Sequence, residues 1–337
     1  MKKTTIYDIA QELNITVSTV SRALSGFPAI SDATRKAVIE TAKKLNYSPN
    51  KLASALKSGK TYTIGVIVPS VEAHFFATII DSLEEGLKDS GYRIILYQSK
   101  ESLIKEIEGV KTLLEAQVDG IIASMSLETD QVSHFEEIIR LAKPLILFDR
   151  VNREIKTPTV TLNDFQAGFM ATEHLIRQGY QKIAFVTTNH QIPIFEQRFK
   201  GYKAALVQHQ LPVIEHHILM GGLSIADGKV SAKQLLSNDP SIDAIIAGDD
   251  FTALGIIQQL KAQGIEPPKI GVIGFANETF SEYITPSLST IEQFPAEMGK
   301  ACAEMFLKMI HQHHPYKDVV NHIIEPIVVE RASTKKV

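Results

Sequence analysis

Polar side chains gather on one side of a short helix that is predicted near the start of the chain. Thr16 is a favourable N-cap residue, and Val17, Val20 and Leu24 follow it on one face of a predicted helix. The polar residues left outside this apolar stripe are Ser18, Thr19, Ser21 and Arg22. Hydroxyl groups and a guanidinium on the open side of such a helix can bind base edges, and this is the chemistry that the segment predicts.

Charge is divided unevenly between the beginning of the chain and the rest. The 337 residues carry a net charge of −3, but residues 1–60 contain ten Lys and Arg against four Asp and Glu, a net charge of +6. The remaining residues carry −9. A basic head on an acidic body indicates that the head meets phosphate groups while the body stays clear of them.

Two further helices flank the segment that begins at Thr16. Thr5 and Asp8 have the spacing of a capping box and start a helix that ends near Asn14. Ser31 precedes a third helix, expected over 33–45. Three short helices with a tight turn between the first two predict a helix-turn-helix, in which the start of the second helix meets base edges. Here those residues are Val17, Ser18 and Arg22. The alternative is a small helical bundle with a solvated basic face.

The segment after this bundle is too short to be a stable helix alone. Ser48-Pro49 is an N-cap followed by proline at the first helical position, and 50–57 could continue for two turns. Isolated helices usually need about 12–15 residues. We therefore expect this segment to be disordered unless a partner completes it.

The head resembles that of the lac repressor/gal repressor (LacI/GalR) family. The resemblance is carried by Thr5–Ala10, Val17–Arg22, Ser31–Thr34, Asn46–Asn50, Leu52-Ala53 and Leu56. It implies a sequence-specific transcription regulator, expected to be a repressor, that binds double-stranded operator DNA as a homodimer. The DNA-contacting residues that it implies are Thr5, Tyr7, Val17, Ser18, Ser21, Arg22, Ser31, Thr34, Tyr47, Asn50, Ala53 and Leu56.

In that family, paired hinge helices enter the minor groove and a leucine from each wedges between base steps. Leu56 occupies this position. An apolar wedge that kinks the duplex would let the flanking heads reach their half-sites. The alternative is that Leu56 is a core leucine of a linker helix.

From Thr61 onward, short apolar runs alternate with helical segments, which predicts parallel sheets covered by helices on both faces. The expected strands are 63–68, 93–97, 120–124, 145–148, 182–187, 244–247 and 270–275, and helices are expected over 76–90, 165–178 and 252–263. Glycine follows each of these helices, at Gly91, Gly179 and Gly264.

The predicted fold is an all-α helix-turn-helix headpiece with a hinge helix, followed by an α/β body of two doubly wound lobes. The boundaries are 1–47 for the DNA-binding domain, 48–60 for the hinge and 61–337 for the body, whose first lobe covers 61–161 and 293–322 and whose second lobe covers 162–292 and 323–337. A last strand, Ile323–Glu330, is expected in the second lobe. Ligands of such sheets bind beyond the carboxyl ends of the strands, so we expect a site between the lobes.

The family resemblance names the body as the type I periplasmic-binding-protein architecture and assigns its effector-binding residues by position. These are Phe75, Phe76, Ser124, Asp149, Arg150, Arg198, Leu223, Asp249, Asn277 and Gln293. Among them, Arg198 and Asp249 suit a polyhydroxylated ligand, because a guanidinium donates to hydroxyl groups and a carboxylate accepts from them.

Several of these assignments have a plainer alternative. Arg198 could be a solvated helix residue, and Asp249 could cap the following helix, although Asp250 is the favoured cap there. Phe75 and Phe76 could belong to the core rather than to a ligand platform.

Two positions depart from the family pattern. Many members have Asp where this chain has Ala276, which leaves Asn277 and Glu278 as alternatives for that ligand contact. Leu223 stands where some sugar-binding members have Trp. We therefore expect a sugar or sugar phosphate as effector first, and a purine or another metabolite second.

Other classes of protein are less well supported. The chain lacks G-x-S-x-G, H-E-x-x-H and G-x-G-x-x-G, so we expect no enzyme and no cofactor. Cys302 is the single cysteine, and the histidines at 216–217 and at 311, 313 and 314 are interpreted as solvated helix-end residues rather than metal ligands. No signal peptide or apolar membrane span is evident, which favours a cytoplasmic location over an exported solute-binding protein.

Overall fold

A computed structural model describes residues 4–47, 59–188, 192–312, 315–316 and 319–336. The chain divides into two compact units, Met1–Thr61 and Tyr62–Val337. Three predicted DNA-contact residues, Asn50, Ala53 and Leu56, lie outside the described residues together with most of the hinge.

The described residues of the first unit form three helices around a small core, as predicted. They are α1 (Ile6–Glu12), α2 (Val17–Leu24) and α3 (Asp32–Lys44). Ile9, Val20 and Val38, one from each helix, are completely buried. Thr16 and Ser31 cap α2 and α3, since their side chains accept the backbone N–H groups of the third helical residues. These caps fix where each helix begins.

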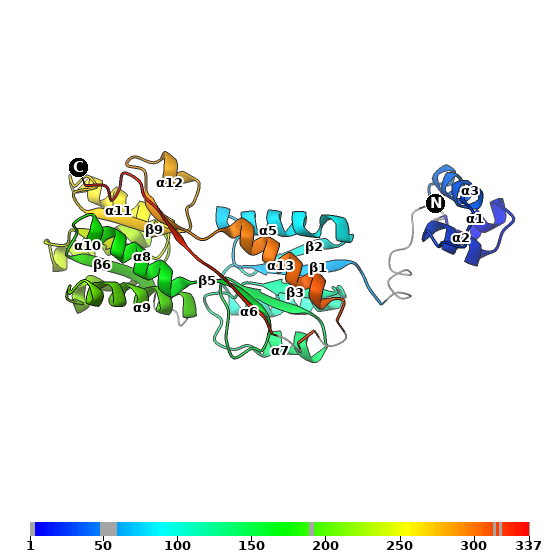
Figure 1. The fold of residues 1–337 in the computed structure, drawn as a ribbon, viewed down its shortest axis with the longest axis horizontal. Coiled ribbons are helices and arrows are strands. Elements are labelled where there is room, and N and C mark those ends of the chain that lie inside the picture. The colour runs from blue at the N-terminus through cyan, green and yellow to red at the C-terminus, as the bar shows by residue number, and fades with distance from the viewer. Residues whose placement is uncertain (1–3, 48–58, 189–191, 313–314, 317–318, 337) are drawn as a thin grey trace. The chain divides into compact units, whose positions relative to one another are not determined.

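A six-stranded parallel sheet forms the centre of the first lobe of the body. Its strands, in spatial order, are β11 (Asn321–Ile324), β5 (Thr159–Leu162), β4 (Leu145–Phe148), β3 (Gly120–Ala123), β1 (Thr63–Val68) and β2 (Arg93–Gln98). The helices α5 (His74–Leu87), continued by the short turn η1 (Lys88–Ser90), and α13 (Pro295–Met309) cover one face. The opposite face is covered by α6 (Leu103–Glu115) and α7 (Ser133–Arg140) (Figure 1).

The second lobe repeats this plan with one strand reversed. Its sheet has the order β12 (Ile327–Val329), β10 (Ser289–Glu292), β9 (Gly271–Phe275), β8 (Ala244–Ile246), β6 (Ile183–Thr188) and β7 (Ile218–Gly221), and only the β10–β12 pair is antiparallel. The helices are α8 (Asp164–Arg177) and α9 (Pro193–Gln208) on one face, α10 (Ile225–Asn238) and α11 (Asp250–Ala262) on the other, and the short η2 (Glu215–His217) and α12 (Phe280–Tyr283).

The chain passes between the lobes after β5, after β10 and between β11 and β12. The last passage corrects the sequence-based expectation of one strand, Ile323–Glu330, in the second lobe. Ile323 and Ile324 pair with β5 in the first lobe, and β12 pairs with β10 in the second. The interruption falls at Pro326, whose ring nitrogen has no hydrogen to donate to a neighbouring strand. The final stretch therefore runs across both sheets (Figure 1).

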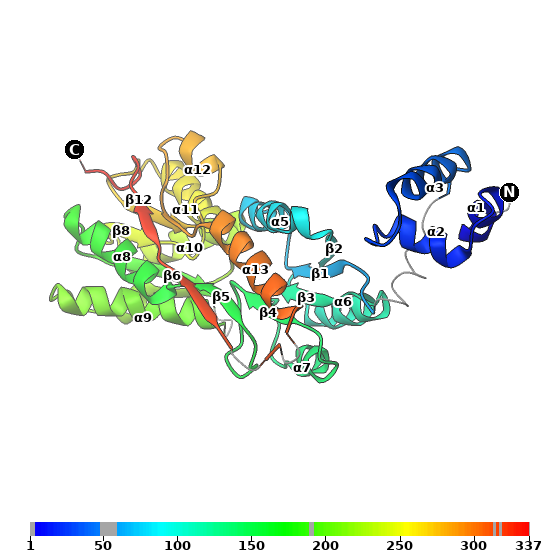
Figure 2. The same ribbon diagram turned by 45° about the vertical axis from the view of Figure 1, so that its right-hand side comes forward.

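Glycines allow helices to pack closely on both lobes. In the first lobe, α5 and α13 lie side by side (Figure 2), and a Cβ at Gly299 would lie 2.4 Å from the Ile79 carbonyl oxygen. In the second lobe, a Cβ at Gly168 of α8 would lie 2.0 Å from the carbonyl oxygen of Arg198 on α9. A methyl group at Gly168 would therefore move the backbone that carries Arg198.

We predict that Gly168→Ala destabilises the body by about 1–3 kcal/mol or more, because the new methyl group meets backbone rather than a flexible side chain. Urea unfolding of the full chain measures the change. Arg177→Ala, at the exposed end of the same helix, is the control and should change stability by less than about 0.5 kcal/mol. Equal stability of the Gly168→Ala variant and the unmodified chain would contradict the close packing.

Candidate DNA-contact surface and interlobe cleft

The start of α2 presents exposed hydroxyl groups, as expected for a recognition helix. Ser18 is exposed and Val17 is half-buried. The Thr16 hydroxyl is 2.8 Å from the Ser18 hydroxyl and 2.9 Å from that of Thr19. These bonds fix the hydroxyl groups next to the first turn of α2, where the major groove would be contacted.

Arg22 lies at the other end of α2 and is also exposed. Its guanidinium carbon lies 5.6 Å from the centre of the Phe27 ring, and Phe27 is itself 48% exposed. A cation over an aromatic face is attracted to it, so this contact orients the guanidinium without burying it. Arg22 therefore remains available to an anionic or base-edge partner.

The remaining predicted DNA-contact residues of the head differ in how exposed their side chains are. Thr5 is exposed at the start of α1, where its backbone N–H and hydroxyl both donate to the Asp8 carboxylate at 2.7 Å. Tyr7 is 69% exposed, whereas Ser21 is half-buried. The helix-capping Ser31 bonds to Thr34, and Tyr47 packs against the core of the head. Thr5, Ser31 and Thr34 thus have local structural roles that are independent of DNA.

A cleft lies between the two lobes of the body, beyond the carboxyl ends of the strands. Eight of the ten predicted effector-binding residues line it, namely Phe75, Phe76, Asp149, Arg150, Arg198, Leu223, Asp249 and Gln293. The other two do not. The Ser124 hydroxyl donates to Asp149 at 3.3 Å, and the Asn277 side chain bonds to Glu292 and Arg331.

Arg198 is a buried cleft residue, so the alternative of a solvated helix residue is wrong. It is 4% exposed, and its Nε donates to Asp164 at 2.9 Å while Nη1 donates to the Gly248 carbonyl oxygen at 3.2 Å. The guanidinium also lies 4.4 Å from the centre of the Phe275 ring. Burial raises the pKa of Asp164 to about 6, and the nearby Arg198 opposes that rise. Sequence reasoning missed Asp164, because its pairing exists only across α8 and α9.

Arg150 supplies the guanidinium of the first lobe. Its Nη1 donates to Glu101 at 2.6 Å, and its Nε lies 3.9 Å from Asp149. That Nε is buried and has no hydrogen-bond acceptor among the described residues. Since an unpaired buried N–H is costly, this donor indicates where a ligand acceptor would be favoured.

Asp249, rather than Asp250, caps α11. Its side chain accepts the Thr252 backbone N–H at 2.7 Å, and its extended backbone, with φ of −154°, is typical of an N-cap residue. Asp250 is instead completely buried and accepts bonds from the Glu278 N–H at 2.8 Å and from the Thr290 hydroxyl at 2.6 Å. Burial raises the pKa of both carboxyl groups.

Glu278 joins the two lobes across the cleft. Its carboxylate, from the second lobe, accepts the backbone N–H groups of His74 at 3.1 Å and Phe75 at 3.4 Å in the first lobe. These are the first N–H groups of α5, whose own N-cap residue, Ala73, has no side chain that could accept them. A carboxylate at a helix N-terminus satisfies free N–H groups and interacts favourably with the helix dipole.

Many family members have Asp at the position of Ala276, and the backbone before Glu278 explains why Glu278 rather than Asn277 faces the cleft here. Ala276 and Asn277 have φ of 109° and 51°, in the region that side chains rarely adopt. This turn directs Glu278 into the cleft and Asn277 toward Glu292. Of the two candidates that the sequence left open at the Ala276 position, only Glu278 lines the cleft.

Both units match known protein families. Residues 5–50 match "Bacterial regulatory proteins, lacI family", and residues 61–326 match "Periplasmic binding proteins and sugar binding domain of LacI family". The chain belongs to the LacI family. The predicted helix-turn-helix head and two-lobed body are thereby confirmed.

Individual relatives cover nearly the whole chain. Catabolite control protein A of Priestia megaterium is 34% identical over 325 residues, which are 95% of this chain and 97% of that protein. The lac repressor dimer bound to operator and an anti-inducer has a TM-score of 0.85 at 22% identity and covers 99% of both chains. A LacI family regulator of Enterococcus faecium with bound ribose has a TM-score of 0.71 at 29% identity, covering 81% of this chain and 98% of that one.

The family assignment settles the broad function. This LacI family member is a DNA-binding transcriptional regulator, and the prediction that it is not an enzyme is confirmed by the regulators among its relatives. No helix in the described part of the chain is long and apolar enough to cross a membrane.

We predict that Arg22→Ala weakens binding to a selected operator duplex by about 1–3 kcal/mol, because a base-reading guanidinium is lost. Fluorescence anisotropy at fixed salt, with an operator selected from random duplexes, measures this change. Binding to a scrambled duplex should change less. Lys111→Ala, on α6 of the body, should leave both affinities unchanged. An equal loss on operator and scrambled duplexes would show that Arg22 contacts phosphate and reads no base.

Proposed function

We propose that this LacI family protein is a cytoplasmic repressor that binds its operator as a homodimer, and that a neutral polyhydroxylated molecule in the interlobe cleft controls its DNA affinity. The observation that carries the proposal is the lining of the cleft, where carboxylates surround a guanidinium with one unpaired N–H. Hydroxyl groups can both donate to the carboxylates and accept from that N–H.

The balance of charge favours a neutral sugar over a sugar phosphate. Four carboxylate residues line the cleft, Asp149, Asp249, Asp250 and Glu278, and a fifth, Asp164, pairs with Arg198. Among the described lining residues, two guanidinium groups face them, those of Arg150 and Arg198. An added phosphate would meet more carboxyl groups than guanidinium groups, whereas a neutral sugar can hydrogen-bond to both. The ribose-bound relative and the description of the matched body family support the same class.

A second effector class, the purines, is supported by the aromatic side of the cleft. The rings of Phe75 and Phe76 line it, and their centres are 5.2 Å apart. Both rings also belong to the hydrophobic core, so stacking on a ligand is an additional role. A purine would use the aromatic surface but leave most of the carboxylates without hydroxyl partners.

Thermal shift of the full chain with neutral sugars, sugar phosphates and purines tests the effector class. A ligand that binds only the folded state raises its melting temperature. We expect neutral sugars to raise it more than their phosphates or purines do. The proposed class is wrong if only phosphorylated or purine compounds have an effect.

Asp249→Asn then separates the capping role of this residue from ligand binding. We predict that the variant keeps the stability of the free protein, because Asn also caps helices well. Its affinity for the sugar found in the screen should fall by about tenfold or more, since hydrogen bonds to charged groups contribute roughly 1.5–3 kcal/mol. Asp130→Asn, at an exposed position outside the helices and strands, is the matched control. Unchanged sugar affinity of Asp249→Asn, by calorimetry, would place the ligand elsewhere.

The Glu278 contact gives the effector a way to act on the lobes. The cleft has a cavity volume of about 100 Å³, which is below the roughly 300 Å³ of typical small-molecule pockets. We propose that a sugar enters when the lobes separate and Glu278 leaves the N-terminus of α5. The contact therefore opposes entry, and ligand binding replaces it with contacts to both lobes.

Glu278→Gln tests this opening step. We predict that sugar association, followed by stopped-flow fluorescence of a labelled chain, becomes about tenfold faster, because an amide interacts less strongly than a carboxylate with the helix N-terminus. Glu282→Gln, at an exposed position of α12, should associate at the unmodified rate. Identical rates for all three chains would contradict the role of Glu278.

Dimerisation would couple the cleft to DNA. Two small heads held at half-site spacing bind far more tightly than one, and the family places the dimer contact on first-lobe helices including α5. A change in lobe angle would alter the distance between the two hinges, which start near Lys60. The predicted wedge at Leu56 belongs to this step.

A further inference from the structure

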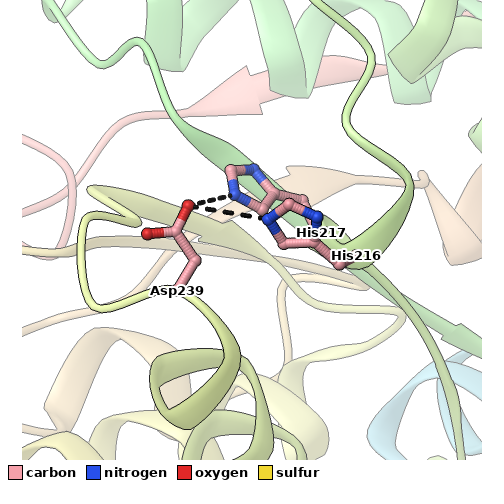
Figure 3. A group of neighbouring side chains, drawn as sticks. All are labelled: His216, His217 and Asp239. Carbon is pink, nitrogen blue, oxygen red and sulfur yellow. Dashed lines mark hydrogen bonds and ion pairs between the residues drawn. The ribbon is translucent and has the colours of Figure 1, made fainter.

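Three metal-ligating side chains converge on the second lobe, outside the cleft. His216 and His217 form the end of η2, and Asp239 is the C-cap residue of α10. The Nε2 atoms of His217 and His216 lie 2.9 Å and 3.8 Å from the same oxygen, Oδ2, of Asp239. Figure 3 shows both imidazole rings directed at that carboxylate. The candidate ligand atoms of all three residues lie within 4.8 Å of one another.

The local backbone explains why two successive histidines reach one carboxylate. In an extended strand, neighbouring side chains point to opposite faces. His216 and His217 lie instead in a 3₁₀ turn, and their rings are almost perpendicular, with centres 4.9 Å apart. The turn therefore brings both imidazoles to the same side just before β7 begins.

Asp239 is held so that one of its oxygens faces the histidines. Its Oδ1 accepts the Ser241 backbone N–H at 2.8 Å and also the Ser241 hydroxyl. These bonds leave Oδ2 for the imidazoles. They also lower the pKa of Asp239, with a further contribution from His217, so the carboxylate is charged at neutral pH. Such outer contacts are what orient the ligands of protein metal sites.

His217 corrects the interpretation of this pair as solvated. It is 1% exposed, and only the His216 side chain, at 57%, is open to solvent. Elsewhere in the described part of the chain, histidines that meet a carboxylate do so one at a time, as His134 does with Glu106 and His209 with Glu173. The group at Asp239 differs from these because two imidazoles share one acceptor.

We propose that His216, His217 and Asp239 bind a divalent transition-metal ion of the Zn²⁺ class. Two imidazoles and a carboxylate are a ligand set that such ions take, with water in any remaining position. In a tetrahedral site with bonds of about 2.1 Å, ligand atoms lie about 3.4 Å apart. The two distances from Asp239 Oδ2, 2.9 Å to His217 and 3.8 Å to His216, each differ from this by about half an ångström. The metal would replace the proton between His217 and Asp239.

Such an ion would cross-link two segments of the second lobe, the turn before β7 and the end of α10. The histidines precede the edge strand β7, and Asp239 ends α10. A ligand that binds only the folded state stabilises it in proportion to the logarithm of its concentration above Kd. The site is therefore structural, and it is separate from the interlobe cleft and from the proposed effector.

The experiment uses the full-length chain, freed of metal by a chelator and titrated with Zn²⁺ against a chromophoric chelator. We expect a single ion per chain and a higher melting temperature with Zn²⁺. His216→Ala, which changes the exposed ligand, should lower the affinity by about tenfold or more and remove the thermal shift. Asp239→Asn should do the same. His209→Ala, which breaks an ordinary His–Glu pair, is the matched control and should bind as the unmodified chain does.

Three results would overturn the proposal. The first is no Zn²⁺ binding by the unmodified chain, and the second is binding that His216→Ala leaves unchanged. The third is an equal loss in His216→Ala and His209→Ala, which would indicate non-specific binding. Substitution of Co²⁺ for Zn²⁺ adds a spectroscopic readout, because the visible absorption of Co²⁺ reports the coordination at the site and should change in His216→Ala.

Discussion

Charged groups that line the cleft must be partnered wherever water is excluded, because an isolated buried charge is strongly unfavourable. Arg198 is paired with Asp164 inside the second lobe, and Arg150 with Glu101 inside the first. Among the described residues, Glu278 has no such partner in its own lobe, and its carboxylate accepts N–H groups of α5 in the other. Satisfying this one charge therefore joins the two lobes.

A ligand in the cleft has to exchange these contacts for its own. The donors and acceptors that remain open are few, since Asp249 caps α11 and Asp250 is bonded to Thr290. Among the described residues, the Nε of Arg150 is a buried donor without an acceptor, and it is therefore available to a ligand. In the proposed mechanism, the same set of hydrogen bonds would therefore govern both ligand binding and the angle between the lobes. The proposed regulation depends on that shared use.

Local sequence patterns predicted most of the architecture. Capping residues such as Thr16 and Ser31 identified the helices of the head, because a cap and the helix that it starts are neighbours in sequence. Apolar runs located most of the central strands. The strands β5, β7 and β10 were not among those expected. Polar residues interrupt β5 and β10, which therefore lack the continuous apolar run that identified β3 and β4 at the same length.

Contacts between distant segments were harder to predict. The sequence suggested most of the cleft residues through family resemblance. It also placed Asn277 in the cleft, favoured Asp250 as the cap of α11 and interpreted His217 as solvated, and the structure differs at these three residues. Each depends on a partner that only the folded chain supplies, such as Arg331 for Asn277 and Asp239 for His217. Neither hydrophobic periodicity nor capping rules contain that information.

The central claim is that the cleft and the operator are energetically coupled. Coupling between two binding sites is reciprocal, so the factor by which a sugar changes operator affinity must equal the factor by which operator changes sugar affinity. Calorimetric titration of the sugar into the full chain, with and without saturating operator duplex, measures the second factor. We predict that the sugar affinities with and without operator differ by the same factor by which the sugar changes operator affinity. Equal sugar affinities in the presence and absence of operator would contradict the account.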